Sequence, residues 1–138
     1  MVYLDSNVFI YPLIYDPDVE PKARAAEEVL RSVASGSIRG VTVTLTWDEV
    51  VWVVWRAIGY DEAVRAGASL MTIPNLSFVE VSPTVLMKAQ ELLDKYKLKP
   101  RDAIHVAAAV LVKEVEVVSD DEELDVVREV RRRPLISA

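Results

Sequence analysis

The sequence predicts an α/β fold, a three-layer α/β/α sandwich around a central parallel sheet of four or five strands. Short valine-rich segments alternate along the chain with segments whose apolar residues recur at helical spacing. This alternation is typical of a parallel sheet that helices cover on both faces. The 138 residues contain no internal repeat, low-complexity stretch or linker. We therefore expect one domain spanning residues 1–138.

The N-terminal part of the chain predicts a strand, a helix and a second strand. Residues 2–4 are apolar and stop at three polar residues, as a buried strand does at its end. Three prolines interrupt the region that follows. Residues 22–35 then carry apolar side chains at helical spacing until Gly36, which predicts a helix crossing back over the sheet. Residues 39–45 are rich in valine and threonine and favour a strand.

The middle of the chain predicts two helices and a third strand. Thr46 and Glu49 have the spacing of a capping box, so we expect a helix that begins at Thr46 and runs to about Ile58. Residues 61–71 have the pattern of another helix. Residues 77–81 read as a strand.

The C-terminal part predicts two more helices and a fourth strand. Residues 82–96 open with Ser-Pro, a pair suited to an N-cap and a first helical position. Residues 100–112 open with Pro-Arg-Asp and are then almost entirely apolar, so this helix is expected to be buried on most sides. Residues 115–118 predict the fourth strand. The arginine-rich residues 128–133 fit a short edge strand.

Composition excludes several classes of site. The chain has no cysteine and one histidine, His105, which excludes disulfides, thiolate sites and imidazole-rich metal sites. A net charge of -6 argues against a broad basic surface for nucleic acid. No secretory leader and no apolar run of about 18 residues is apparent, so we expect no membrane partner and a cytoplasmic location.

Four acidic residues fall where a parallel sheet forms its ligand crevice. Asp5 and Asp121 follow two predicted strands, while Glu49 and Asp102 lie in first helical turns. Each residue alone also fits a capping role. Together, converging carboxylates repel one another unless they are protonated or share a cation, and oxygen ligands of this kind select Mg²⁺ or Mn²⁺.

The ordered acidic fragments resemble those of a known family. LDSNVFI, TWDEVVW, RDAIHVAAA and VSDDEELD are similar to the four acidic motifs of PIN-domain proteins, and in length and motif style the chain resembles VapC-like toxins, which are ribonucleases. The resemblance implies that these four acids are catalytic and that three of them, Asp5, Asp102 and Asp121, bind the metal ion. Glu49 corresponds to the second acid of that set.

The fourth motif departs from the family pattern. Family members often read Ser/Thr, any residue, Asp, two residues and then Phe-Asp, and Ser119, Asp121 and Asp125 fit that spacing with leucine in place of phenylalanine. We prefer Asp121 over its neighbour Asp120 as the fourth acid. The resemblance also implies cleavage of RNA with Mg²⁺ or Mn²⁺, a homodimer and a VapB-like antitoxin partner.

Several residues have two readings. Ser6, Asn7 and Thr46 fit polar support of the site, although Ser6 and Thr46 also suit capping. Single histidines on apolar helices are usually packed and hydrogen-bonded, which is the role we expect for His105. The set of candidate RNA phosphate contacts is Arg101, Arg131 and Arg132; the arginines of the tail equally suit a charged edge that prevents strand pairing.

The tryptophan-rich stretch 47–55 places large apolar groups on more than one helical face, which indicates a self-association surface or a groove for a partner helix. Other functions also fit the acidic pattern. The chain could process ribosomal or transfer RNA precursors without an antitoxin. It could also be a non-catalytic magnesium-binding module, or a phosphatase-like or receiver-like domain, although such domains usually carry a second acid close to the first. Here Asp5 is followed by serine and asparagine.

Overall fold

The computed structural model describes residues 1–136. In this part of the chain five parallel strands form one sheet in the order β3-β2-β1-β4-β5. The strands are β1 (Val2–Leu4), β2 (Gly40–Val43), β3 (Leu76–Val79), β4 (Glu116–Val118) and β5 (Arg131–Arg133). The predicted α/β fold with a parallel sheet of four or five strands is therefore confirmed.

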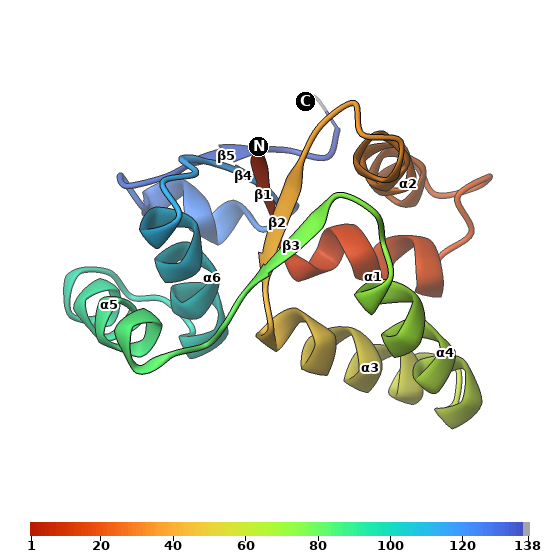
Figure 1. Cartoon of the computed structure of the whole chain (residues 1–138), viewed down its shortest axis with the longest axis horizontal. Helices are drawn as coiled ribbons and strands as arrows, with labels where there is room; N and C mark the ends of the chain where they lie inside the picture. Colours follow the sequence, from red (N-terminus) through yellow and green to blue (C-terminus); the bar gives the residue numbers. More distant parts are fainter. Residues whose placement is uncertain (137–138) are drawn as a thin grey trace.

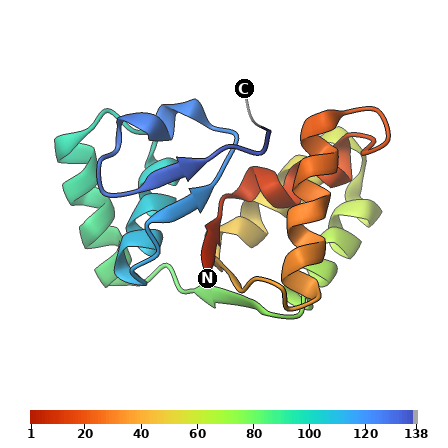
Figure 2. The same cartoon turned by 90° about the horizontal axis from the view of Figure 1, so that it is seen from above.

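Helices cover both faces of the sheet and complete the three layers (Figure 1). They are α1 (Ser6–Ile14), α2 (Pro21–Ala34), α3 (Leu45–Ala57), α4 (Tyr60–Met71), α5 (Pro83–Lys95) and α6 (Pro100–Leu111), with a short 3-10 helix, η1 (Glu122–Val126). Figure 2 shows α5, α6 and η1 on one side and α1 to α4 on the other. None of the helices within residues 1–136 combines the length and apolar character that crossing a membrane requires.

Alternation along the strands divides the buried side chains between two cores. Tyr3 packs with α5, α6 and η1, whereas the next residue, Leu4, packs with α1 to α4. Both side chains are fully buried. The central strand β1 thus contributes to both cores, as expected of a parallel strand covered on both faces.

Two local expectations are correct. Gly36 has φ +86° directly after α2, a left-handed conformation that glycine adopts without a steric penalty. The Ser82 hydroxyl accepts a hydrogen bond from the Val85 amide at 3.2 Å, as an N-cap does, and Pro83 begins α5.

Two local expectations are wrong. Residues 6–14 form a helix in spite of Pro12, because the buried face of Val8, Phe9 and Ile10 outweighs the lost backbone hydrogen bond. Helix α3 begins at Leu45 after Thr44, so Thr46 is not its N-cap and the predicted capping box does not form.

Candidate metal-dependent active site

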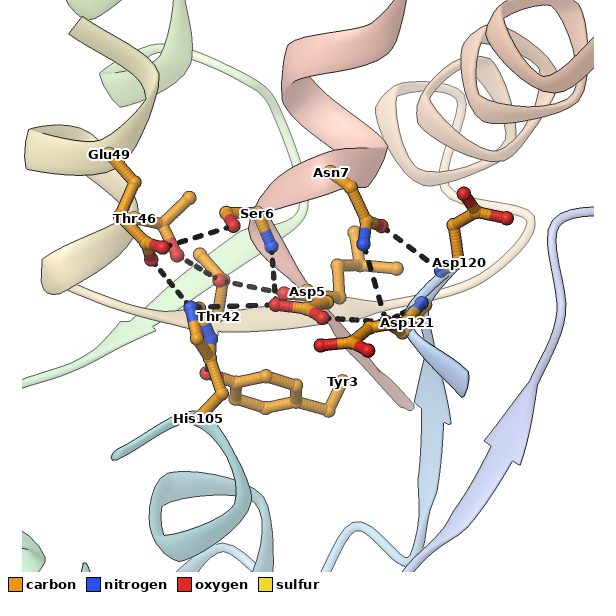
Figure 3. Close-up of polar contacts among 12 residues, drawn as sticks. Tyr3, Asp5, Ser6, Asn7, Thr42, Thr46, Glu49, His105, Asp120 and Asp121 are labelled. Carbon is orange, nitrogen blue, oxygen red and sulfur yellow. Dashed lines mark hydrogen bonds and ion pairs between the residues drawn. The ribbon is translucent and has the colours of Figure 1, made fainter. Parts of the chain in front are cut away.

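The carboxyl ends of β1 and β4 meet at the centre of the sheet. The chain winds from β1 toward β2 on one side and later adds β4 on the other, which makes this the predicted switch point. Asp5 follows β1, and its amide donates to the Val118 carbonyl at 3.0 Å. Ser119 follows β4, and its hydroxyl donates to Asp5 Oδ2 at 2.6 Å. These two hydrogen bonds connect the strand ends directly, and Figure 3 shows Asp5 and Asp121 side by side there.

A buried histidine joins Glu49 to the Asp5 side of the site (Figure 3). His105 Nε2 donates to Glu49 Oε1 at 2.6 Å and lies 3.5 Å from Asp5 Oδ1. Its other ring nitrogen, Nδ1, is hydrogen-bonded to the Tyr3 hydroxyl at 2.7 Å. The expectation of a packed, hydrogen-bonded histidine is confirmed, but the partners of His105 are two of the predicted catalytic acids.

The charges around His105 favour its protonated form. Burial alone would lower the pKa of His105, but the attraction of Asp5 and the hydrogen bond and charge of Glu49 outweigh burial and raise it. Burial and the nearby Asp5 carboxylate raise the pKa of Tyr3 well above its usual range, so the phenol stays neutral. The imidazole thus lies between the two carboxylates, which stabilise its protonated form.

A second group of carboxylates lies beside Asp5. Asp102, Asp121 and Glu123 each present an oxygen within 4.8 Å of the others. Asp102 Oδ2 is buried and has no hydrogen-bond partner among the described residues. Burial, followed by the charges of Asp121 and Asp5, raises the pKa of Asp102 to about 7.

This group fits a hard divalent cation. Its donors are all carboxylate oxygens, the ligands that Mg²⁺ and Mn²⁺ prefer. The unpartnered Asp102 oxygen is the kind of buried polar atom that requires a partner, and a cation supplies one. A cation also offsets the mutual repulsion that raises the pKa of Asp102.

The two neighbouring aspartates after β4 point in different directions (Figure 3). The Asp121 carboxylate belongs to the group with Asp102. The Asp120 carboxylate instead accepts a hydrogen bond from the Tyr11 hydroxyl at 2.7 Å and pairs with Lys22 at 3.1 Å. This arrangement favours Asp121 as the fourth acid.

The predicted polar support differs from residue to residue. The Ser6 hydroxyl donates to Glu49 Oε2 at 3.3 Å. The Asn7 side-chain nitrogen donates to Ser119 Oγ at 3.3 Å, and its oxygen accepts from the Asp120 amide. Thr46 is fully buried, and its hydroxyl lies 2.7 Å from that of Thr42, so it faces the interior of the protein.

The basic residues also divide into two kinds. Arg101 and Lys99 are exposed and, with Glu49, Pro100 and Asp102, line a pocket of about 530 Å³. Lys99 Nζ also lies 3.7 Å from Glu123 Oε1, so Lys99 is paired with one carboxylate of the group that includes Asp102. The Arg132 guanidinium is already engaged: it donates to both oxygens of Asp125, at 2.8 and 3.1 Å, and to the Ser119 carbonyl at 3.1 Å. Arg131 is exposed on the edge strand β5, where a charged side chain can also serve to prevent pairing with another strand.

Sequence reasoning did not identify Glu123 or the link through His105. Glu123 lies two residues after Asp121, and η1 brings its carboxylate back toward Asp102. His105 follows Asp102 by three residues on α6, a spacing that places both on one helical face and could have indicated a shared site.

Comparisons with known proteins agree with this architecture. A VapBC complex from Salmonella typhimurium, solved bound to DNA, superposes with a TM-score of 0.73 at 12% identity, covering 99% of this chain and 100% of that chain. The VapC20 toxin of Mycobacterium tuberculosis, described as cleaving the sarcin-ricin loop, superposes with a TM-score of 0.72 at 20% identity. The superposition covers 95% of this chain and 99% of the toxin chain. A VapBC2 complex from Rickettsia felis, bound to a promoter DNA fragment, superposes with a TM-score of 0.73 at 11% identity. The superposition covers 97% of this chain and 98% of that chain.

Because the sequence identities are only 11% to 20%, these structural similarities show that the fold is shared and no more. No curated protein sequence matches the chain. The family model described as the PIN domain matches residues 2–130, which include all the acidic residues of the site. The chain therefore belongs to the PIN domain family.

Proposed function

We propose that this protein is a Mg²⁺- or Mn²⁺-dependent ribonuclease and the toxin of a VapBC-type pair. One observation carries the proposal: Asp102, Asp121 and Glu123 converge within 4.8 Å around a buried oxygen that has no partner among the described residues. A group of like charges at the switch point of a parallel sheet is costly for folding, so a role in binding explains its presence.

Asp102, Asp121 and Glu123 would hold the ion, with Asp5 beside them. A bound divalent cation supplies Lewis acidity at the scissile phosphate and lowers the pKa of a water ligand. Asp5 is held in place by the Ser119 hydroxyl, which also accepts a hydrogen bond from the Asp121 amide at 3.0 Å. One serine therefore fixes the relative positions of two of the acids.

Glu49 is the residue we assign to proton transfer. His105 holds Glu49 Oε1, while Oε2 has, among the residues that the structure describes, only the longer contact with Ser6. Glu49 lines the same pocket as Asp102, so Oε2 is positioned to accept a proton from the attacking water. His105 acts here as a positioning residue because it contacts Glu49 rather than the pocket.

Arg101 and Lys99 supply positive charge at the edge of this pocket. A phosphodiester is repelled by a protein of net charge -6, and two cations beside the carboxylates reduce that repulsion where the substrate enters. We therefore assign to Arg101 a contact with the phosphate next to the scissile one.

The proposed partners are an antitoxin and a second copy of the chain. Two of the similar structures are VapBC complexes, which supports a VapB-like antitoxin for this protein. Trp47, Trp52 and Trp55 of α3 are each nearly half exposed, an unusual exposure for tryptophan that supports association through this face.

Substitution of Asp5 tests the function. Asp5→Asn is expected to lower Mg²⁺-dependent RNA cleavage at least about 100-fold, because a charged group beside the ion is lost. The asparagine oxygen can still accept the hydrogen bond of Ser119, but the side-chain nitrogen cannot accept the hydrogen bond that the Ser6 amide donates to Asp5 Oδ1. We therefore expect a modest fall in the unfolding temperature, and cleavage is compared at a temperature where both proteins are folded. Asp48→Asn is the matched control, since Asp48 is exposed on the same helix as Glu49.

Cleavage is measured on single-stranded RNA and single-stranded DNA, with Mg²⁺ or Mn²⁺ and with EDTA. Equal RNA cleavage by Asp5→Asn and the parent protein would show that the site is misassigned. Induced expression in cells without an antitoxin tests whether the protein is a toxin: the parent should arrest growth, and Asp5→Asn should not. A parent that cleaves RNA without arresting growth would favour the RNA-processing alternative.

A further inference from the structure

A second polar pocket opens next to the carboxylate site and has no part in the chemistry described above. It measures about 240 Å³ and is lined by Tyr11, Tyr15, Glu20, Lys22 and Asp120. It lies where α1 ends and α2 begins. The Asp120 amide donates to Asn7 Oδ1 at 3.3 Å, and the next residue, Asp121, belongs to the metal-binding group. Asp120 thus connects the lining of this pocket to the loop that carries Asp121, although the two carboxylates point in different directions.

The pocket has a fixed polar side and an open aromatic side. Asp120 Oδ2 accepts hydrogen bonds from the Tyr11 hydroxyl at 2.7 Å and from Lys22 Nζ at 3.2 Å, so this carboxylate is held in position. Tyr15 is 50% exposed and meets the Tyr11 ring edge to face at 5.6 Å. Half of a large aromatic side chain is thus available to a ligand.

The charges in the lining favour a base over a phosphate. Asp120 already neutralises Lys22, and Glu20 adds another carboxylate, so a phosphate would meet net negative charge. Carboxylates instead accept hydrogen bonds from the amino groups of bases. Aromatic rings stack with any exposed base. The volume lies below the roughly 300 to 1,000 Å³ of pockets for drug-sized ligands, which suits a single ring system.

We propose that this pocket binds one unpaired nucleobase of the RNA substrate, stacked on Tyr15 with its amino edge toward Asp120 and Glu20. The inference rests on the proposed ribonuclease function and adds to it a base-binding subsite on the Asp120 side of the acidic group. A base inside a duplex cannot enter such a pocket without leaving its stack. Recognition through bases also explains how a protein of net charge -6 selects a polyanion.

Cleavage of a random-sequence single-stranded RNA library, followed by sequencing of the products, tests the pocket. The parent protein with Mn²⁺ should prefer particular bases at one position next to the cut. Tyr15→Ala should abolish that preference and raise KM about tenfold, with a smaller effect on kcat, because stacking contributes mainly to binding. Val19→Ala is the matched control, because Val19 is 76% exposed in the same loop and does not line the pocket.

A second pair of measurements separates stacking from an effect on folding. Tyr15→Leu keeps much of the apolar volume without the aromatic ring, and it should lose the preference while unfolding at the parent temperature. In RNA with an abasic residue at the preferred position, parent and Tyr15→Ala should have the same KM. A tenfold difference that persists on abasic RNA would overturn the proposal.

The outcomes distinguish this inference from the proposed function. Library RNA that the parent protein does not cut in an Asp5-dependent way would reject the ribonuclease itself. Asp5-dependent cutting with the same base preference in the parent and Tyr15→Ala would reject only the base pocket. The same result, with weaker binding of a co-expressed antitoxin by Tyr15→Ala, would reassign the pocket to a protein side chain.

Discussion

At the scale of single residues, the site brings together an acid and a base whose pKa values are both raised. Burial and neighbouring carboxylates raise the pKa of Asp102 to about 7. The pKa of His105 is also raised, because Asp5 and Glu49 outweigh the effect of its burial. Protons thus offset part of the charge when no divalent ion is bound.

The raised pKa of Asp102 predicts a pH-dependent cost to folding. Between pH 3.8 and about 7 the folded protein retains a proton that the unfolded chain has lost, so stability falls as pH rises through this window. Asp102→Asn removes that cost. In EDTA at pH 8 the variant should be more stable than the parent, on the order of 1–2 kcal/mol after allowance for partial exposure.

Thermal or urea unfolding from pH 3 to 8 measures this effect. The difference between Asp102→Asn and the parent should disappear as pH falls below 3.8, because the carboxyl is then protonated in both the folded and the unfolded state. Added Mg²⁺ should stabilise the parent and narrow the difference at pH 8, because the ion binds the folded state. A variant less stable than the parent at pH 8 in EDTA would contradict the raised pKa.

Residue types and their order along the chain predicted Asp5, Glu49, Asp102 and Asp121 as candidate site residues, and the fold brings these four side chains to one end of the sheet. Predicting Glu123 as well requires the path of η1, a turn too short to have a periodic pattern. The partner of His105 was equally hidden, because Glu49 lies 56 residues away in the sequence. Contacts of this range depend on the folded topology.

At the scale of elements, a short loop after β4 carries half of the acidic site. Asp121 begins the loop as N-cap of η1, accepting from the Glu123 amide at 2.9 Å. Arg132 of β5 hydrogen-bonds the chain on both sides of Asp121: the Ser119 carbonyl before it and the Asp125 carboxylate after it. The loop is therefore fixed by the edge strand rather than by apolar contacts alone.

Arg132→Ala should loosen this loop and weaken Mn²⁺ binding about tenfold, the low end for residues that orient metal ligands. Arg132→Lys keeps the charge but loses the two-pronged geometry, so it should restore only part of the affinity. Arg133→Ala is the control, because its pair with Glu116 is largely exposed and contributes little. Calorimetric titration giving Arg132→Ala the parent affinity would exclude this role.

Helix α1 shows the limit of local rules at this scale. Pro12 argues against a helix at residues 6–14, yet the helix forms because its N-terminal half is buried against α2 and α3. The start of α3 is a similar case: Thr46 has the sequence of a cap, but packing places its hydroxyl against Thr42. Tertiary contacts override propensity at both positions.

At the scale of the whole molecule, α3 and α4 leave an apolar face that the rest of residues 1–136 does not cover. Trp52 and Trp55 meet edge to face at 5.8 Å and remain 47% exposed. Trp47 is partly used in packing, because a Cβ at Gly67 of α4 would come within 2.9 Å of its indole nitrogen. Core packing therefore accounts for only part of the tryptophan-rich stretch.

We expect this face to join two copies of the chain. Trp55→Ser should shift the protein toward the monomer without lowering its unfolding temperature by more than a few degrees, because the side chain is half exposed. Sedimentation velocity over a dilution series measures the change. Met87→Ser on α5, at a side chain 70% exposed, should leave the mass unchanged. A parent protein that is monomeric at every concentration would rule out the interface.

The place of β1 in the sheet has a consequence for synthesis on the ribosome. This first strand to emerge lies between β2 and β4, and its second neighbour is translated more than a hundred residues later. Asp5 can meet Ser119 and Asp121 only when most of the polypeptide has left the exit tunnel. A nascent chain therefore lacks the acidic site until the residues of β4 and of the loop after it have been translated, so the proposed nuclease activity would be absent from a shorter nascent chain.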